Sequence, residues 1–72
     1  MPHIAIESHV SGTVWKIVAQ VGDPLAAGDT VLVIESMKME IPVEAPTAGT
    51  LVKLLVAEGD AVTEGQVLGQ LS

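Results

Sequence analysis

The sequence predicts an all-β fold, a flattened antiparallel barrel or sandwich of two quasi-symmetric four-stranded halves. Two observations lead to this expectation. Apolar residues make up 49% of the chain and are almost all Val, Leu, Ile and Ala, and β-branched side chains fit a pleated, half-buried surface. The chain is also written twice, because a shift of 37 positions places residues 1–35 over residues 38–72 without a gap.

The two copies share eight identical residues, and apolar residues fill both members of many other pairs. The identical pairs are Ile4/Ile41, Glu7/Glu44, Gly12/Gly49, Thr13/Thr50, Lys16/Lys53, Gly22/Gly59, Asp23/Asp60 and Gly28/Gly65. An internal duplication explains this match. Two copies indicate a symmetric domain, since a solenoid needs more repeats.

Each half is expected to form four short strands separated by glycine turns. The expected strands lie near 4–7, 13–20, 24–26 and 30–35, with counterparts near 41–44, 50–57, 61–63 and 67–71. Glycine adopts positive φ without steric cost and is therefore typical of turns. We assign six glycines to structural turns: Gly12, Gly22, Gly28, Gly49, Gly59 and Gly65. No window has the apolar periodicity of a helix.

Length and charge limit the classes of function. Residues 1–72 are expected to form one domain, and a chain this short has little room for an enclosed active site. The net charge of −6, with three lysines and no arginine, argues against a nucleic-acid partner. There is no signal-peptide pattern, and the apolar runs are far shorter than the ~20 residues of a membrane-spanning helix. We therefore expect a cytoplasmic protein that binds neither nucleic acid nor membrane.

Few residues suggest catalysis or metal binding. There is no cysteine, and His3 and His9 lack a third ligand at suitable spacing, so we expect no metal site. No arrangement of Ser, His and Asp can be defended as a catalytic set from spacing alone. Trp15, the one aromatic residue, is interpreted as a half-buried strand residue, with a docking anchor as the alternative.

Lys38 is the residue that the repeat does not explain. Lys16 and Lys53 are repeat mates and are expected to be solvated strand residues, whereas Lys38 faces Met1 in the alignment. If the strands on either side of the joint between the copies pair, Lys38 lies in a tight hairpin turn at an exposed tip. The two termini then meet at the opposite end of the domain.

The residues beside Lys38 are unusual for a turn. Met37 and Met39 stand where turns favour Asn, Asp or Gly. Exposed methionines make adaptable contact surfaces for partner proteins. The alternative is that these two side chains close the end of the barrel as part of the core, with Lys38 an ordinary surface residue.

The segment around Lys38 resembles the attachment sequence of biotinyl domains, the carrier parts of biotin-dependent carboxylases and transcarboxylases. The segment is Glu35-Ser36-Met37-Lys38-Met39-Glu40. Other matches at the spacing of this family are Gly12-Thr13-Val14, Val21-Gly22-Asp23, Gly28 and Ala45-Pro46-Thr47-Ala48-Gly49-Thr50. The resemblance thus covers essentially the whole chain, and the flattened β-barrel that it implies agrees with the fold expected from the repeat.

The sequence departs from the family pattern at three places. Ser36 stands where biotinyl domains usually have Ala, and Ser is common in the related lipoyl domains, which also have Glu at the place of Glu35. Lipoyl domains, however, typically have Asp before the lysine and Ala after it. Ser8-His9 replaces the Ala-Pro found in many relatives. The thumb loop of some bacterial biotinyl domains is missing, because the halves align without an insertion.

The resemblance implies a non-catalytic carrier whose covalent cofactor is biotin on Lys38, attached by a biotin protein ligase. Ligase recognition is implied for Glu35, Ser36, Met37, Met39 and Glu40. An ATP-dependent biotin carboxylase would load the biotin with a carboxyl group. A carboxyltransferase would then pass this group to an acyl-CoA or a 2-oxo acid.

Since residues 1–72 are one domain, we expect a separate small subunit or an orphan carrier. Two alternatives stay open. The first is a lipoyl or dual biotin/lipoyl carrier for 2-oxo acid dehydrogenase complexes, with lipoate as the less favoured cofactor. The second is an unmodified β-barrel interaction module, which would need no unique lysine at the tip.

Overall fold

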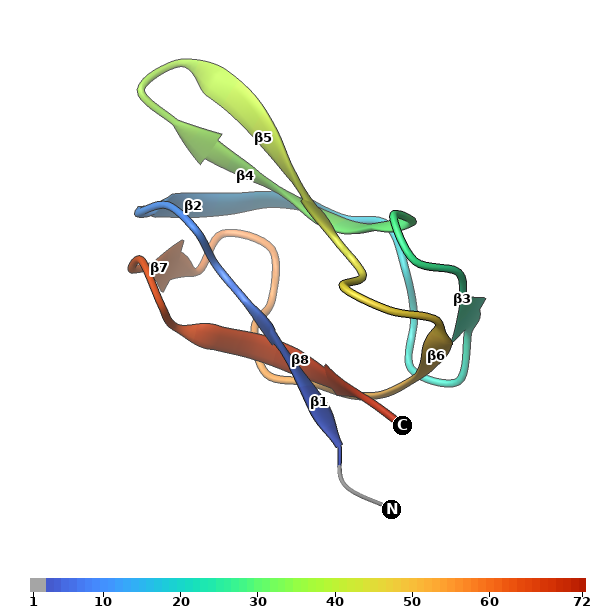
Figure 1. The fold of residues 1–72 in the computed structure, drawn as a ribbon. Helices are drawn as coiled ribbons and strands as arrows, with labels where there is room; N and C mark the ends of the chain where they lie inside the picture. The colour runs from blue at the N-terminus through green and yellow to red at the C-terminus, as the bar shows by residue number, and fades with distance from the viewer. Residues whose placement is uncertain (1–2) are drawn as a thin grey trace.

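The computed structural model describes residues 3–72, which fold into eight strands in two antiparallel sheets (Figure 1). The strands are β1 (Ile4–Glu7), β2 (Gly12–Ile17), β3 (Pro24–Leu25), β4 (Thr30–Ser36), β5 (Met39–Glu44), β6 (Gly49–Leu54), β7 (Ala61–Val62) and β8 (Val67–Leu71). One sheet has the order β1-β8-β6-β3 and the other β5-β4-β2-β7. The predicted all-β fold is therefore confirmed. No helix in residues 3–72 is long and apolar enough to cross a membrane.

The duplication in the sequence is also present in the fold. The shift of 37 residues converts β1, β2, β3 and β4 into β5, β6, β7 and β8. It therefore converts the order β1-β8-β6-β3 into β5-β4-β2-β7. Each sheet takes two strands from each half, so the halves are interleaved and neither half forms a sheet alone.

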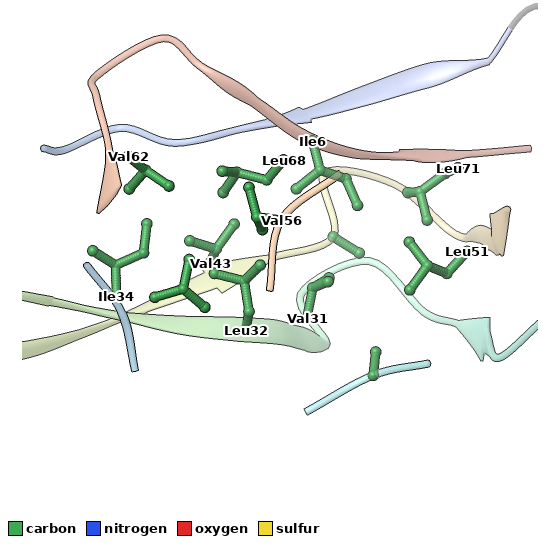
Figure 2. Packing of buried hydrophobic residues seen from close by; sticks show 13 residues of the cluster. Ile6, Val31, Leu32, Ile34, Val43, Leu51, Val56, Val62, Leu68 and Leu71 are labelled. Carbon is green, nitrogen blue, oxygen red and sulfur yellow. The ribbon is translucent and has the colours of Figure 1, made fainter. Parts of the chain in front are cut away.

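The core fills the space between the two sheets. Figure 2 shows Ile6, Leu68 and Leu71 on one side facing Leu32 and Ile34 on the other. All five side chains are at least 99% buried. The remaining core residues are also aliphatic: Val14, Ala19, Val31, Val43, Ala45, Leu51, Val56 and Val62. A core without large aromatic rings suits a narrow molecule, which measures 36 × 17 × 17 Å.

Four equivalent turns connect the strands, and each has a positive-φ glycine followed by a polar residue. The φ values of these glycines are 100° at Gly22, 90° at Gly28, 93° at Gly59 and 87° at Gly65. After each glycine, a side-chain oxygen accepts a hydrogen bond from the backbone N–H three residues earlier. The acceptors are Asp23, Asp29, Asp60 and Gln66, with donor–acceptor distances of 2.8–3.0 Å.

The predicted strands 13–20 and 50–57 were too long. β2 ends at Ile17 and β6 at Leu54. The turn hydrogen bonds begin at Gln20 and Ala57, so the chain must leave the strand ladder before these residues. The two residues after each strand, Val18-Ala19 and Leu55-Val56, are as apolar as the strands themselves, so the sequence pattern does not reveal where the strands end.

The prediction that Gly12 and Gly49 are turn residues is wrong. They are the first residues of β2 and β6. Neither has positive φ. A Cβ on Gly12 would overlap the carbonyl oxygen of Glu35, and one on Gly49 would lie 2.8 Å from that of Ser72. Both glycines therefore permit a close approach between backbones, which also explains why both copies contain them.

The attachment candidate and the chain ends lie at opposite ends of the molecule. β4 and β5 form a long hairpin whose turn projects away from the barrel (Figure 1). At the other end, Ile4 at the start of β1 pairs with Leu71 at the end of β8. The hairpin tip is therefore free of the terminal strands, as the symmetry of the sequence predicts.

Candidate functional site

The tip of the β4–β5 hairpin is a two-residue turn formed by Met37 and Lys38. Ser36 and Met39 are the last paired residues on the two strands. The φ angle is 50° at Met37 and 68° at Lys38, and these are the only two residues other than glycine with positive φ in the part of the chain that is described. Positive φ at both central residues is the requirement of a type I′ turn, whose twist matches that of the flanking strands.

This backbone conformation is costly for the residues that adopt it. Left-handed conformations cost L-residues other than glycine roughly 1–2 kcal/mol each, and type I′ turns therefore favour Asn-Gly. The four glycine turns elsewhere in this chain show how easily positive φ is supplied without strain. Side chains kept at two strained positions indicate a function at the tip.

Both methionines point away from the core. Met37 is 93% exposed and Met39 is 63% exposed. The alternative that they close the end of the barrel is therefore wrong. Lys38 between them is exposed as well. The tip thus presents a primary amine between two flexible thioethers, which can adapt to a partner surface.

The base of the hairpin is fastened to β2 and to the loop before it. The Ser36 hydroxyl donates a hydrogen bond of 2.8 Å to the carbonyl oxygen of Ser11. The Ser11 hydroxyl accepts one of 3.1 Å from the backbone N–H of Glu64. Gly12 allows β2 to approach the backbone of Glu35 closely. These contacts fix the base of the hairpin against β2 and orient its tip.

Two glutamates flank the tip on the same face of the hairpin. Glu35 and Glu40 are exposed and lie directly opposite each other on β4 and β5. Like charges across a strand pair are destabilising. The pair therefore adds nothing to folding, and it places negative charge on the surface that a partner of Lys38 would meet.

The other candidate residues lie elsewhere. Lys16 and Lys53 are exposed residues within β2 and β6, as expected for repeat mates on solvated strands. His3 lies 3.2 Å from the amide oxygen of Gln70, measured from its Nδ1 atom, and His9 is exposed between β1 and β2. Within residues 3–72 there is no group of three or more His, Cys, Asp or Glu side chains that could hold a metal ion.

Sequence reasoning missed the supporting role of Ser11 and Gly12. Ser11 is 25 residues from Ser36, so no local pattern links the two. Gly12 stands out in the sequence as a repeated glycine, which predicts a turn. Its repetition was a correct signal of a backbone constraint, whereas the kind of constraint depends on a neighbouring strand.

Comparisons with known proteins identify the family of the chain. A family model described as "Biotin-requiring enzyme", for the biotin and lipoyl attachment domain, matches residues 1–71. The biotin/lipoyl attachment protein of Bacillus subtilis is 39% identical over 69 residues, which are 96% of this chain and 94% of that protein. The biotin-dependent acyl-coenzyme A carboxylase alpha3 subunit of Mycobacterium leprae is 40% identical over 67 residues, 93% of this chain and 11% of that subunit.

The structural comparison points the same way. The crystal structure of the Kluyveromyces lactis urea carboxylase contains a similar domain, with a TM-score of 0.95 and 38% identity over 100% of this chain. The chain spans only 6% of that enzyme, so the similarity concerns one domain and not the whole enzyme. From its sequence, its interleaved β fold and the lysine on its hairpin turn, the chain belongs to the biotin/lipoyl attachment domain family.

Proposed function

We propose that Lys38 is the covalent attachment point for biotin and that the chain is a non-catalytic biotin carboxyl carrier. One observation supports this most directly. Lys38 is an exposed amine in a strained two-residue turn between two exposed methionines. A biotin protein ligase would join the biotin carboxyl group to the Lys38 Nζ atom as an amide. The domain would then serve a biotin carboxylase and a carboxyltransferase, with an acyl-CoA or a 2-oxo acid as the final acceptor.

The geometry suits a cofactor held by a bond and not by a pocket. No cavity is present among residues 3–72, and a tethered group needs only an accessible amine on a rigid base. When attached, biotin supplies a ring nitrogen that accepts and releases a carboxyl group. The contribution of this chain is to hold the Lys38 amine clear of the barrel and to raise the effective concentration of its cargo at each partner site.

Ser36 and Gly12 support this role from below the tip. The hydrogen bond from Ser36 to the Ser11 carbonyl and the tight contact between Gly12 and β4 limit the angles that the hairpin adopts. A partner enzyme would therefore meet the same tip geometry on each visit. Our expectation of a cytoplasmic location stays a prediction from the sequence.

The attachment site can be tested by replacing each lysine in turn. With biotin, ATP and a biotin protein ligase, the wild-type chain should gain about 226 Da, the mass of one amide-linked biotin. Lys38→Arg should abolish both this gain and streptavidin binding. Lys16→Arg and Lys53→Arg are matched controls, because both residues are exposed on strands, and both variants should be labelled normally. Labelling of the Lys38→Arg chain would contradict the assignment.

A lipoyl carrier is the second candidate, favoured by Ser36 and by a relative whose name includes both cofactors. Met37 and Met39 argue for biotin, so lipoyl ligase should add its group of about 188 Da slowly or not at all. Met37→Asp with Met39→Ala should reduce biotinylation while the fold is kept, because both side chains are exposed. Equal rates of the two modifications on the wild-type chain would instead indicate a dual carrier.

A further inference from the structure

Because of the internal duplication, each residue on the outer face of one sheet has an equivalent residue on the outer face of the other. The side chains of the two faces can therefore be compared position by position. Thr13 pairs with Glu35 in the β5-β4-β2-β7 sheet, and its repeat mate Thr50 pairs with Ser72 at the same place in the second sheet. Both sheets also have a bulge just before the repeated lysines Lys16 and Lys53. Side chains that differ between these matched faces are therefore not needed for the fold that the faces share.

The apolar content of the two faces differs. On the β5-β4-β2-β7 sheet, Lys16 pairs with Val33 and Val33 with Pro42, and Trp15 lies in the bulge next to them. At the equivalent positions the β1-β8-β6-β3 sheet has smaller or polar residues: Val52, Gln70 and Ala5. Trp15 is 50% exposed. At these three positions the face beside the β4–β5 hairpin thus has larger apolar side chains than its repeat partner.

The charges differ in the same way. Glu35, Glu40 and Glu44 surround the apolar residues on β4 and β5, and all three are exposed. Their repeat mates are Ser72, His3 and Glu7, so only one of the three equivalent positions on the other face has an acidic side chain. Each face has one lysine, Lys16 or Lys53, which does not change the comparison.

Protection of a sheet edge explains only part of this pattern. Proline and charged residues on an edge strand prevent pairing with other chains, and β5 is an edge strand that contains Pro42 and two glutamates. Val33, however, lies on the interior strand β4, and Trp15 on β2 is neither a proline nor a charged residue, so edge protection explains neither side chain. An exposed tryptophan within an acidic border is typical of a protein-binding surface.

We propose that the outer face of the β5-β4-β2-β7 sheet docks on the biotin carboxylase that loads the carrier, an inference that rests on the function proposed above. Its apolar centre is Trp15, Val33 and Pro42, and its acidic border is Glu35, Glu40 and Glu44. A carboxylase that uses ATP and bicarbonate must attract two anions, so the entrance to its active site carries positive potential. An acidic border beside the tether complements such an entrance.

The position of the face relative to the tip agrees with this partner. Glu35 and Glu40 are separated from the turn by only one residue on each strand, Ser36 and Met39. When a partner protein binds this face, the Lys38 side chain therefore lies at the edge of the interface. The matched face belongs to the sheet that contains the terminal strands β1 and β8, and this sheet lies away from the hairpin tip (Figure 1).

The test uses one purified biotin carboxylase that accepts the biotinylated wild-type chain. The KM of this enzyme is measured for each fully biotinylated variant of the carrier. Trp15→Val introduces the residue found at the matched position 52 and should raise KM about fivefold or more. Glu44→Gln should raise KM about threefold and weaken its dependence on salt. In both variants kcat should stay unchanged, since neither residue is near the tethered group.

Matched variants on the other face serve as controls. Glu7→Gln removes the same charge at the repeat position of Glu44, and Val52→Ala truncates the repeat mate of Trp15. Both should leave KM within about 1.5-fold of the wild-type value, because a substitution outside an interface has little effect on binding. Urea denaturation establishes that each variant is folded, and the intact mass establishes that each variant carries one biotin before KM is measured.

Each result bears on a separate claim. Unchanged KM values for both Trp15→Val and Glu44→Gln, with full biotinylation, would overturn the docking inference and leave the carrier function standing. Equal increases in KM for variants on the two faces would also overturn it. Slower biotinylation without a change in the carboxylase KM would overturn it too, because the face would then bind the ligase. A wild-type chain that gains no biotin would contradict the proposed function itself and the docking inference with it.

Discussion

The turn at the hairpin tip is expected to lower the stability of the domain, and this can be measured. Met37 and Lys38 have φ of 50° and 68°, whereas Asn-Gly is the pair that type I′ turns favour. We therefore consider the double substitution Met37→Asn with Lys38→Gly. This variant lacks the proposed attachment lysine. It tests only whether Met37 and Lys38 occupy a backbone conformation that Asn and Gly would adopt with less strain.

The expected magnitude follows from the geometry and the exposure. Relief of left-handed strain at two residues contributes about 2 kcal/mol. Glycine offsets roughly 0.5–1 kcal/mol of this gain, because it increases the conformational entropy of the unfolded chain. Little burial is lost, because Met37 is 93% exposed. The free energy of unfolding should therefore rise by about 1 kcal/mol, which corresponds to about 4–8 °C in Tm for a domain of this size.

Urea denaturation followed by circular dichroism gives the free energy of unfolding, and a thermal scan gives Tm. Met39→Asn is the control, since Met39 is also exposed but lies in β5 without positive φ. This variant should be neutral or slightly destabilised, because asparagine is unfavourable in strands. A double variant that is no more stable than the wild-type chain would refute the argument that the tip is strained.

Four further substitutions test other parts of the structure. Gly22→Ala and Gly59→Ala should each lower the free energy of unfolding by about 1 kcal/mol or more. The two losses should be similar, since both glycines have positive φ and no atom within 4 Å of an added Cβ. An unchanged free energy of unfolding in urea for both variants would contradict the turn assignment. Gly12→Ala should cost more, about 2 kcal/mol, because its Cβ would overlap a carbonyl oxygen of β4; a denaturation midpoint equal to that of Gly22→Ala would argue against this contact. Ser36→Ala should lower the free energy of unfolding by about 1 kcal/mol through loss of its hydrogen bond to Ser11. Mass spectrometry should still find full biotinylation of this variant. A free energy of unfolding equal to that of the wild-type chain would mean that the hydrogen bond does not stabilise the hairpin.

Much of this protein is determined by local features of its sequence. The composition favours strands, and the repeat predicts two equivalent sets of four. Turn glycines such as Gly22 and Gly59 are recognisable because positive φ and a following aspartate are local requirements. Lys38 is recognisable for the opposite reason, since it is the lysine that breaks the repeat.

The tertiary structure decided what depends on contacts between distant residues. Only the pairing of strands shows that each sheet combines both halves and that Gly12 is needed for a close approach to Glu35. The early end of β2 depends on where the next turn folds back. The same holds for the face around Trp15, because Val33 and Pro42 come onto this face only through the pairing of β4 with β2 and with β5. Local preferences act over a few residues, whereas strand register and surface patches are set by the packing of the whole chain.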